Sequence, residues 1–209
     1  LGIAVIMDLV HAHYVKNLNE GINELDGSDH QYSLPGEAGY QPYWDSKTFD
    51  YGRPEVQHFL LSNVKYWLDE FRFDGYRFDG VTSMVYRHHG YTDFDCREKF
   101  FDEGINRDAL TYLTLANRLI HDFRPGAVTI AEEVSGMPGM CIPAEQGGIG
   151  FDYRLGMAIP DFWIKYLKEV PDEEWNIWEM WSIMTDRLPA VKTVAYAESH
   201  DQALVGDKT

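Results

Sequence analysis

Hydrophobic and polar residues form two kinds of segment along the chain. Short runs rich in β-branched and aromatic residues predict strands, and longer stretches with apolar residues at the helical period predict helices. The predicted strands are 3–10, 75–81, 128–134 and 193–199, with a weaker one near 150–155. The predicted helices are 55–71, 108–123 and 173–187, the last with Asp172 as its N-cap.

Apolar strands that alternate with amphipathic helices indicate parallel pairing, in either a barrel or an open doubly wound sheet. Charged or imidazole groups follow four of the strands, at Asp8, Asp79, Glu132 and the pair His200 and Asp201. An open sheet binds its ligand at one switch point, whereas a barrel collects groups from many strand ends on one face. The pattern therefore predicts an α/β chain of the (β/α)8 TIM-barrel type.

The stretch between the first two strands is much longer than the ~30 residues that one barrel unit takes. Its part from about 14 to 52 is rich in Gly, Asn, Asp and Tyr and has no sustained periodicity. We expect a small inserted lobe there, beside the functional face, because long barrel loops usually serve function.

Two polar residues share one face of the strand around 75–81. Alternation turns Arg77 and Asp79 to one side and Tyr76 and Phe78 to the other. Arg77 would keep Asp79 ionised, and an ionised carboxylate at a strand end is a suitable nucleophile. The alternative is a buried ion pair that only fixes the register, although such pairs contribute little to stability.

Two neighbouring glutamates follow the apolar strand around 128–134. Glu132 continues the strand to its rim, and alternation turns Glu133 to the opposite side. An apolar surround raises the pKa of a carboxyl group, as a general acid near neutral pH needs, so the pattern favours Glu132.

One ionised and one protonated carboxyl group are the equipment of retaining glycoside chemistry. We expect Asp79 to attack the anomeric carbon while Glu132 serves as acid and then base. Asp201 would stabilise the positive charge of the transition state. Polar groups at strand ends make Asp8, His13 and His200 candidates for contacts to sugar hydroxyls.

Other polar and aromatic residues allow two interpretations each. His11 with His13 could form a zinc site, but no matching partner cluster supports it. His88 and His89 lie in a polar loop, where solvated side chains are expected. The aromatic residues of the predicted lobe either stack on sugar rings or form its small core: Tyr40, Tyr43 and Trp44.

Glu55 and His58 begin a helix that is entered from the catalytic face, so they could contact an outer part of a glucan. The alternative for Glu55 is that it only complements the helix dipole.

The net charge of the chain limits the kinds of partner that it is expected to bind. The chain has 18 Lys and Arg against 34 Asp and Glu, a net charge of −16, which disfavours nucleic acid and anionic membranes. No apolar run is long enough to span a bilayer. Cys96 and Cys141 have no metal-ligand spacing, and we expect two reduced thiols in a reducing compartment.

Four strand-end motifs resemble the conserved regions of the α-amylase superfamily, glycoside hydrolase family thirteen, in that family's order. They read DLVHAH at 8–13, DGYRFDGV at 74–81, IAEEV at 130–134 and ESHDQ at 198–202. The resemblance implies Asp79 as nucleophile, Glu132 as acid and base, and Asp201 as transition-state stabiliser. It also implies sugar contacts from the remaining strand-end groups, namely Asp8, His13, Arg77 and His200.

Further sequence segments resemble eukaryotic-type 1,4-α-glucan branching enzymes within that superfamily. The runs are 44–52, 71–84, 134–139 (VSGMPG) and 197–208, which ends in ALVGDK. This resemblance implies that an α-1,4-glucan chain is cut and transferred to a 6-hydroxyl, forming an α-1,6 branch in glycogen or starch. A hydrolase of the amylase type and a non-catalytic glucan-binding scaffold are the alternatives.

The resemblance has three further implications. The chain covers about strands 3 to 7 of the barrel, and an N-terminal carbohydrate-binding module and a C-terminal β-domain are absent from it. No cofactor or metal is expected, because Ala12 stands where many amylases have an Asn that supports a calcium site. The location is cytoplasmic, or a plastid if the source is a plant or alga.

Overall fold

A sheet of five parallel strands lies at the centre of the chain, in the order β1-β4-β5-β6-β7. This computed structural model describes residues 2–21, 23–185 and 191–202. The strand order follows the chain, as in a barrel, so the fold class of a partial (β/α)8 barrel is confirmed. The strands are shorter than predicted: β1 Ile6–Leu9, β4 Gly75–Phe78, β5 Val128–Ala131, β6 Tyr153–Leu155 and β7 Thr193–Val194.

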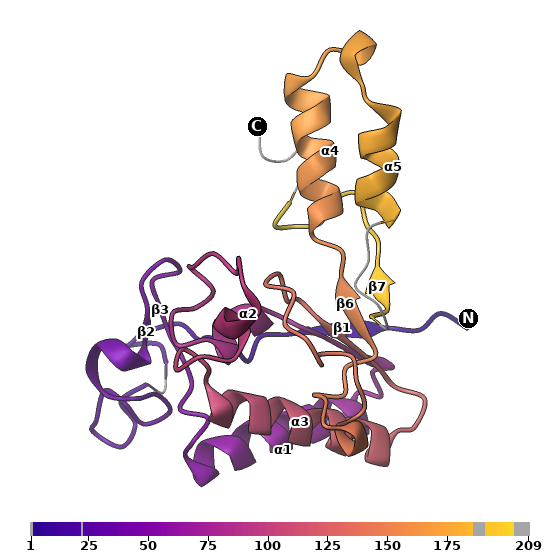
Figure 1. Cartoon of the computed structure of the whole chain (residues 1–209). Helices are drawn as coiled ribbons and strands as arrows, with labels where there is room; N and C mark the ends of the chain where they lie inside the picture. Colours follow the sequence, from indigo (N-terminus) through magenta and orange to yellow (C-terminus); the bar gives the residue numbers. More distant parts are fainter. Residues whose placement is uncertain (1, 22, 186–190, 203–209) are drawn as a thin grey trace.

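Two long helices cover one face of this sheet, α1 (Pro54–Glu70) and α3 (Arg107–Phe123) (Figure 1). Proline occupies the first turn of α1, where its missing N–H costs nothing. The side chain of Asn106 caps α3 by accepting a hydrogen bond from the amide of Ala109 at 3.2 Å. The buried stripe of α1 recurs every fourth residue: Val56, Leu60, Val64 and Leu68.

The helix-covered face of β4 is aromatic. Tyr76 and Phe78 are fully buried, and the hydroxyl of Tyr76 donates to the backbone oxygen of Val64 in α1 at 2.6 Å. That bond satisfies the one polar atom that Tyr76 brings into the core. The opposite face of the strand is left for polar side chains.

The predicted lobe contains a short antiparallel hairpin of β2 (Tyr40–Gln41) and β3 (Ser46–Lys47), preceded by the 3₁₀ turn η1 (Gly36–Gly39). Its aromatic core is built by Tyr14 with Phe49, whose rings are 4.7 Å apart, and by Tyr32. The three aromatic residues considered from the sequence lie elsewhere: Tyr43 and Trp44 are exposed, and Tyr40 hydrogen-bonds to Asp45.

Two connections depart from the simple alternation of strands and helices. A short helix, α2 (Val81–Val85), and the 3₁₀ turn η2 (Arg97–Phe100) stand between β4 and α3. Between β5 and β6 the described chain has only the 3₁₀ turn η3 (Ala144–Gln146).

A helical hairpin of α4 (Ala158–Glu169) and α5 (Ile177–Thr185) projects away from the sheet (Figure 1). No helix was predicted at α4, whose Pro160 lies in the first turn, where a proline is tolerated. The cap predicted at Asp172 is wrong. The residues 172–174 form the turn η4 (Asp172–Glu174), and Asn176 accepts from the amides of Trp178 and Glu179 instead.

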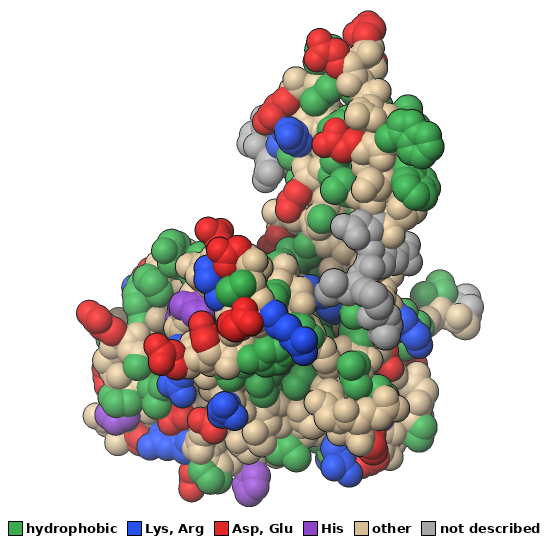
Figure 2. Space-filling model, viewed as in Figure 1, with side chains coloured by type: hydrophobic (Ala, Val, Ile, Leu, Met, Phe, Trp, Pro, Cys, Tyr) green, Lys and Arg blue, Asp and Glu red, His purple; other side chains and the backbone are tan. Residues whose placement is uncertain are grey.

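Acidic side chains are spread over the visible face, and hydrophobic ones cluster on the hairpin (Figure 2). On α5, Trp178 is 78% exposed. The predicted end of this helix at Arg187, and the run 203–208 of the last motif, lie outside the described residues.

Within the described ranges, no helix has the length and apolar character needed to cross a membrane. Both cysteines are free thiols, with Cys96 exposed and Cys141 partly buried.

Gly75 allows β4 and β5 to pair closely. A Cβ at this position would overlap the carbonyl oxygen of Val128 and come within 2.7 Å of its amide nitrogen. We expect Gly75→Ala to lower the free energy of unfolding of the full-length protein by at least about 1–3 kcal/mol, the usual cost of overpacking. Gly126→Ala is the control, because nothing lies within 4 Å of its Cβ. Equal unfolding midpoints for the two variants would contradict this view of the sheet.

Candidate active site

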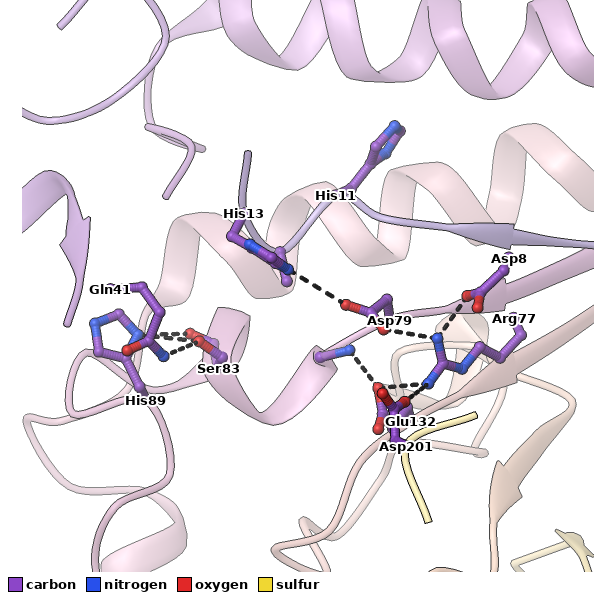
Figure 3. A network of polar contacts seen from close by, with 12 residues as sticks. Asp8, His11, His13, Gln41, Arg77, Asp79, Ser83, His89, Glu132 and Asp201 are labelled. Atoms are coloured by element: carbon purple, nitrogen blue, oxygen red, sulfur yellow. Dashed lines mark hydrogen bonds and ion pairs between the residues drawn. The ribbon is translucent and has the colours of Figure 1, made fainter. Parts of the chain in front are cut away.

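The guanidinium of Arg77 joins four carboxylates from four different segments (Figure 3). Its Nη1 lies 2.6 Å from Oδ1 of Asp8 and 2.6 Å from Oδ1 of Asp79. Its Nη2 lies 2.9 Å from Oε2 of Glu132 and 3.5 Å from Oδ2 of Asp201. The Arg77 side chain is only 13% exposed, and Asp79 and Glu132 are similarly covered, whereas Asp8 and Asp201 are about half-exposed.

Strand register explains why these groups meet. Asp8 and Arg77 are directly paired across β1 and β4, so their side chains share a face. The amide of Glu132 donates to the carbonyl of Phe78 at 3.0 Å, which continues the ladder one residue beyond β5. Gly80 has φ 57°, a left-handed conformation that favours glycine, and this turn directs its amide to Oε2 of Glu132 at 2.7 Å.

Burial and neighbouring charges shift the pKa of Glu132, one of the two central carboxyl groups. Burial raises the pKa of Glu132 more than the Gly80 amide and the Arg77 charge lower it, and the negative charge of Asp79 adds to the rise. Arg77 contacts both groups, Asp79 at 2.6 Å through Nη1 and Glu132 at 2.9 Å through Nη2. Glu132 therefore tends to hold a proton although it lies beside a cation.

His13 completes this arrangement from the loop after β1. Its Nε2 lies 3.8 Å from Oδ2 of Asp79, and its ring lies 4.9 Å from the Trp44 ring. Burial lowers the pKa of His13 more than Asp79 raises it, so the neutral imidazole is favoured. Its buried Nδ1 has no hydrogen-bond partner among the residues that the structure describes.

A cavity of about 530 Å³ opens over the two carboxyl groups. Four of the predicted site residues line it: His13, Asp79, Glu132 and Asp201. Trp44, one of the aromatic residues considered for sugar stacking, also lines it. The sequence did not indicate the rest of the wall, which comes from α2, the loop after it and the residue before α4: Thr82, Ser83, His89, Tyr91 and Met157. A second hollow, of about 400 Å³ beside α3, holds the ion pair of His121 and Asp152 but no comparable convergence of carboxylates.

The last site residues are the most open to solvent. Nε2 of His200 lies 3.1 Å from Oδ2 of Asp201 and 4.0 Å from Oδ2 of Asp8. The side chains of His200 and Asp201 are 66% and 51% exposed, so this edge of the site is accessible to a ligand.

Glu133 lies on the opposite side of the strand end and is fully buried. Its carboxylate is 2.8 Å from Nη2 of Arg154, and it accepts from the amide of Ser135 at 2.8 Å and the hydroxyl of Thr82 at 3.2 Å. All of its acceptor capacity is used inside the protein, so only Glu132 of the two faces the cavity.

Glu55 and His58 lie apart from the carboxylates, and their contact with an outer part of a glucan stays a prediction. Neither lines the cavity, and both are exposed on α1. His58 instead lines a groove formed with α3, next to Leu61 and Leu119.

The two histidine pairs lie in different environments. His11 is buried between α1 and α3, with Nδ1 2.6 Å from the Tyr112 hydroxyl and Nε2 3.0 Å from Oδ1 of Asn63. Burial lowers its pKa to about 4, and it points away from His13, so the two do not form a zinc site. His89 was expected to be solvated, but it is half-buried and lines the cavity.

No group of three or more His, Cys, Asp or Glu side chains within residues 2–21, 23–185 and 191–202 is arranged to hold a metal ion. Ala12 is buried and lies close to Gly80, where a Cβ would come within 3.0 Å of the alanine methyl. The expectation of no calcium stays a prediction.

Solved structures of other proteins share the fold of this chain. No protein-family model matches the chain. A maltogenic α-amylase from Thermotoga neapolitana aligns with 96% of this chain and 39% of its own, with a TM-score of 0.53 and 19% identity. A debranching enzyme from Nostoc punctiforme aligns with 96% and 43%, with a TM-score of 0.58 and 16% identity. The chain therefore has the fold of the amylase-type (β/α)8 barrel enzymes.

Sequence relatives define the family more narrowly. The 1,4-alpha-glucan-branching enzymes of Yarrowia lipolytica, Felis catus and Dictyostelium discoideum are 52%, 53% and 50% identical to it. Each alignment includes 100% of this chain but only 30% to 32% of the relative, so the chain spans about a third of their length. The chain belongs to the 1,4-alpha-glucan-branching enzyme family.

The structural role of Glu133 can be tested by its effect on stability. Glu133→Gln leaves the buried Arg154 without its counter-charge, and breaking a buried pair in this way costs about 3–5 kcal/mol. We expect a loss of that size in the free energy of unfolding of the full-length protein. Glu173→Gln, on an exposed residue of η4, should change it by less than about 0.5 kcal/mol. A Glu133→Gln protein as stable as this control would contradict the structural role.

Proposed function

We propose that this chain carries the reaction centre of a glucan branching enzyme, which cuts an α-1,4-glucan and transfers the cut chain to a 6-hydroxyl. The observation that supports it most is the pair Asp79 and Glu132, which line one cavity and contact opposite ends of the Arg77 guanidinium. Retaining glycoside chemistry needs one charged and one protonated carboxyl group at such a place.

The first step breaks the glycosidic bond. Glu132 donates its proton to the bridging oxygen while Oδ of Asp79 attacks the anomeric carbon. The bond between that carbon and the bridging oxygen breaks, the released chain leaves with a new 4-hydroxyl, and a glycosyl ester forms on Asp79. Burial assists because it raises the pKa of Glu132 and so keeps the proton available.

The second step forms the branch. The ionised Glu132 takes the proton of an incoming 6-hydroxyl as its oxygen attacks the anomeric carbon, and Asp79 leaves as a carboxylate. Two inversions at the same carbon retain the α configuration. Water in place of the 6-hydroxyl would give hydrolysis with the same residues.

The residues around the two carboxyl groups can bind sugar hydroxyls and stabilise charge on the sugar ring. Asp201, 3.5 Å from Arg77 and half-exposed, can grip sugar hydroxyls and stabilise the positive charge that develops on the sugar ring. The neutral imidazole of His13 lies beside Asp79, and His200 and Asp8 lie at the open edge, where both can hydrogen-bond to hydroxyls.

The nucleophile has a direct test. Asp79→Asn keeps the shape but removes the attacking charge, so we expect branch formation by the full-length protein to fall by several orders of magnitude, as loss of a covalent nucleophile does. New α-1,6 linkages and released reducing ends are both measured on amylose, with glucan binding as the control for folding. Reducing ends without branches in the unchanged protein would indicate a hydrolase, and full activity of Asp79→Asn would refute the assignment.

The pH profile tests the acid. Glu132 must be protonated to act, so activity falls as the pH rises through its pKa, which burial places above the ~4.3 of an ordinary Glu. The alkaline limb of kcat/KM should therefore lie above that value. His13→Gln removes a group that gains a proton on the acid side, so it should change the acid limb and leave the alkaline limb in place. An alkaline limb that moves in His13→Gln would show that His13, and not Glu132, sets it.

A further inference from the structure

A chain of polar contacts joins three separate segments beside the cavity (Figure 3). Nδ1 of His89 lies 3.1 Å from the Ser83 hydroxyl of α2 and 3.3 Å from its carbonyl oxygen. Nε2 of Gln41, in β2 of the lobe, donates to the same hydroxyl at 3.2 Å, and Oε1 of Gln41 accepts from the amide of Tyr43 at 3.1 Å. The lobe, α2 and the loop after α2 are thereby tied together.

This contact chain is built into the fold. Gln41 is fully buried and Ser83 nearly so, and an amide and a hydroxyl at such depth need the partners that they have here. His89 has φ 57°, an unusual conformation for a residue other than glycine. Burial lowers the pKa of His89, so its imidazole stays neutral.

The position of this wall points to its ligand. Asp8 and Arg77 lie on one side of the two reacting carboxyl groups, and Ser83 and His89 lie on the other (Figure 3). The charged side suits the sugar on which positive charge develops. The chain that leaves, and the acceptor that replaces it, must then extend along the neutral side, past Gly80 and Glu132.

The chemistry of the neutral side suits an uncharged sugar chain. Ser83 and His89 offer neutral polar groups, and the Tyr91 ring packs on Tyr43 with ring centres 3.8 Å apart. Trp44, which lies against His13, adds an exposed aromatic surface. Aromatic rings with neutral hydrogen-bonding groups match sugar faces and hydroxyls.

We propose that His89 is a positioning residue: through Ser83 and Gln41 it fixes the wall that orients the acceptor glucan beside Glu132. The inference rests on the proposed function, because it names the part of that site which favours a sugar 6-hydroxyl over water. A wall that holds the acceptor raises its local concentration at the glycosyl ester, so the wall governs transfer more than bond cleavage.

The test uses His89→Asn in the full-length protein, since asparagine tolerates the left-handed backbone but lacks the reach of the imidazole. We expect the number of α-1,6 branches per released reducing end to fall about tenfold, as loss of a few hydrogen bonds predicts. Cleavage of α-maltosyl fluoride, which needs no acceptor glucan and little help from an acid, should change less than about twofold. His88→Asn is the matched control. The asparagine side chain can still accept the hydrogen bond that the Gly90 amide donates to Nδ1 of His88 at 3.2 Å.

A second variant keeps the test decisive if His89→Asn does not fold. Ser83→Ala removes one hydroxyl from the same chain and should lower the branch ratio about threefold to fivefold. An unchanged ratio in a folded His89→Asn or Ser83→Ala protein overturns the inference, as does an equal loss of fluoride cleavage and branching. An unchanged protein that makes no branches would refute the proposed function itself, which is a separate result.

Discussion

One guanidinium facing four carboxylates is the constraint on which the site depends. Arg77 can balance only part of the negative charge that Asp8, Asp79, Glu132 and Asp201 would carry if all were ionised. Burial raises the pKa of Glu132 despite the nearby cation, so this carboxyl group tends to keep a proton. The proposed roles of acid and nucleophile rest on this placement of Glu132 and Asp79 around Arg77.

The scaffold supports this arrangement on both faces of the sheet. Strand alternation gives the neighbours Glu132 and Glu133 different environments, one at a cavity and one inside the protein against Arg154. The buried pair of Glu133 and Arg154 fixes the turn that follows β5, and Glu133 also accepts the amides of Gly136 and Met137 at 3.2 Å. The strand end is held from behind, so the Glu132 carboxyl group is oriented by the backbone as well as by Arg77.

Local patterns were enough to predict the parallel sheet and the convergence of Asp79, Glu132 and Asp201, because alternation and strand ends are encoded within a few residues. Long-range contacts were not accessible in this way. The sequence predicts a solvated His89. Its burial depends on Ser83 and, through Ser83, on Gln41, which lies far away in the chain, in the lobe.

Trapping the covalent intermediate tests the central claim most directly. In Glu132→Gln, α-maltosyl fluoride should still react, since fluoride leaves with little protonation, but release to an acceptor lacks its base. Peptide mass spectrometry of the full-length variant should find one maltosyl group as an ester on Asp79. A label on another carboxylate, or turnover that inverts the anomeric configuration without any label, would contradict the account.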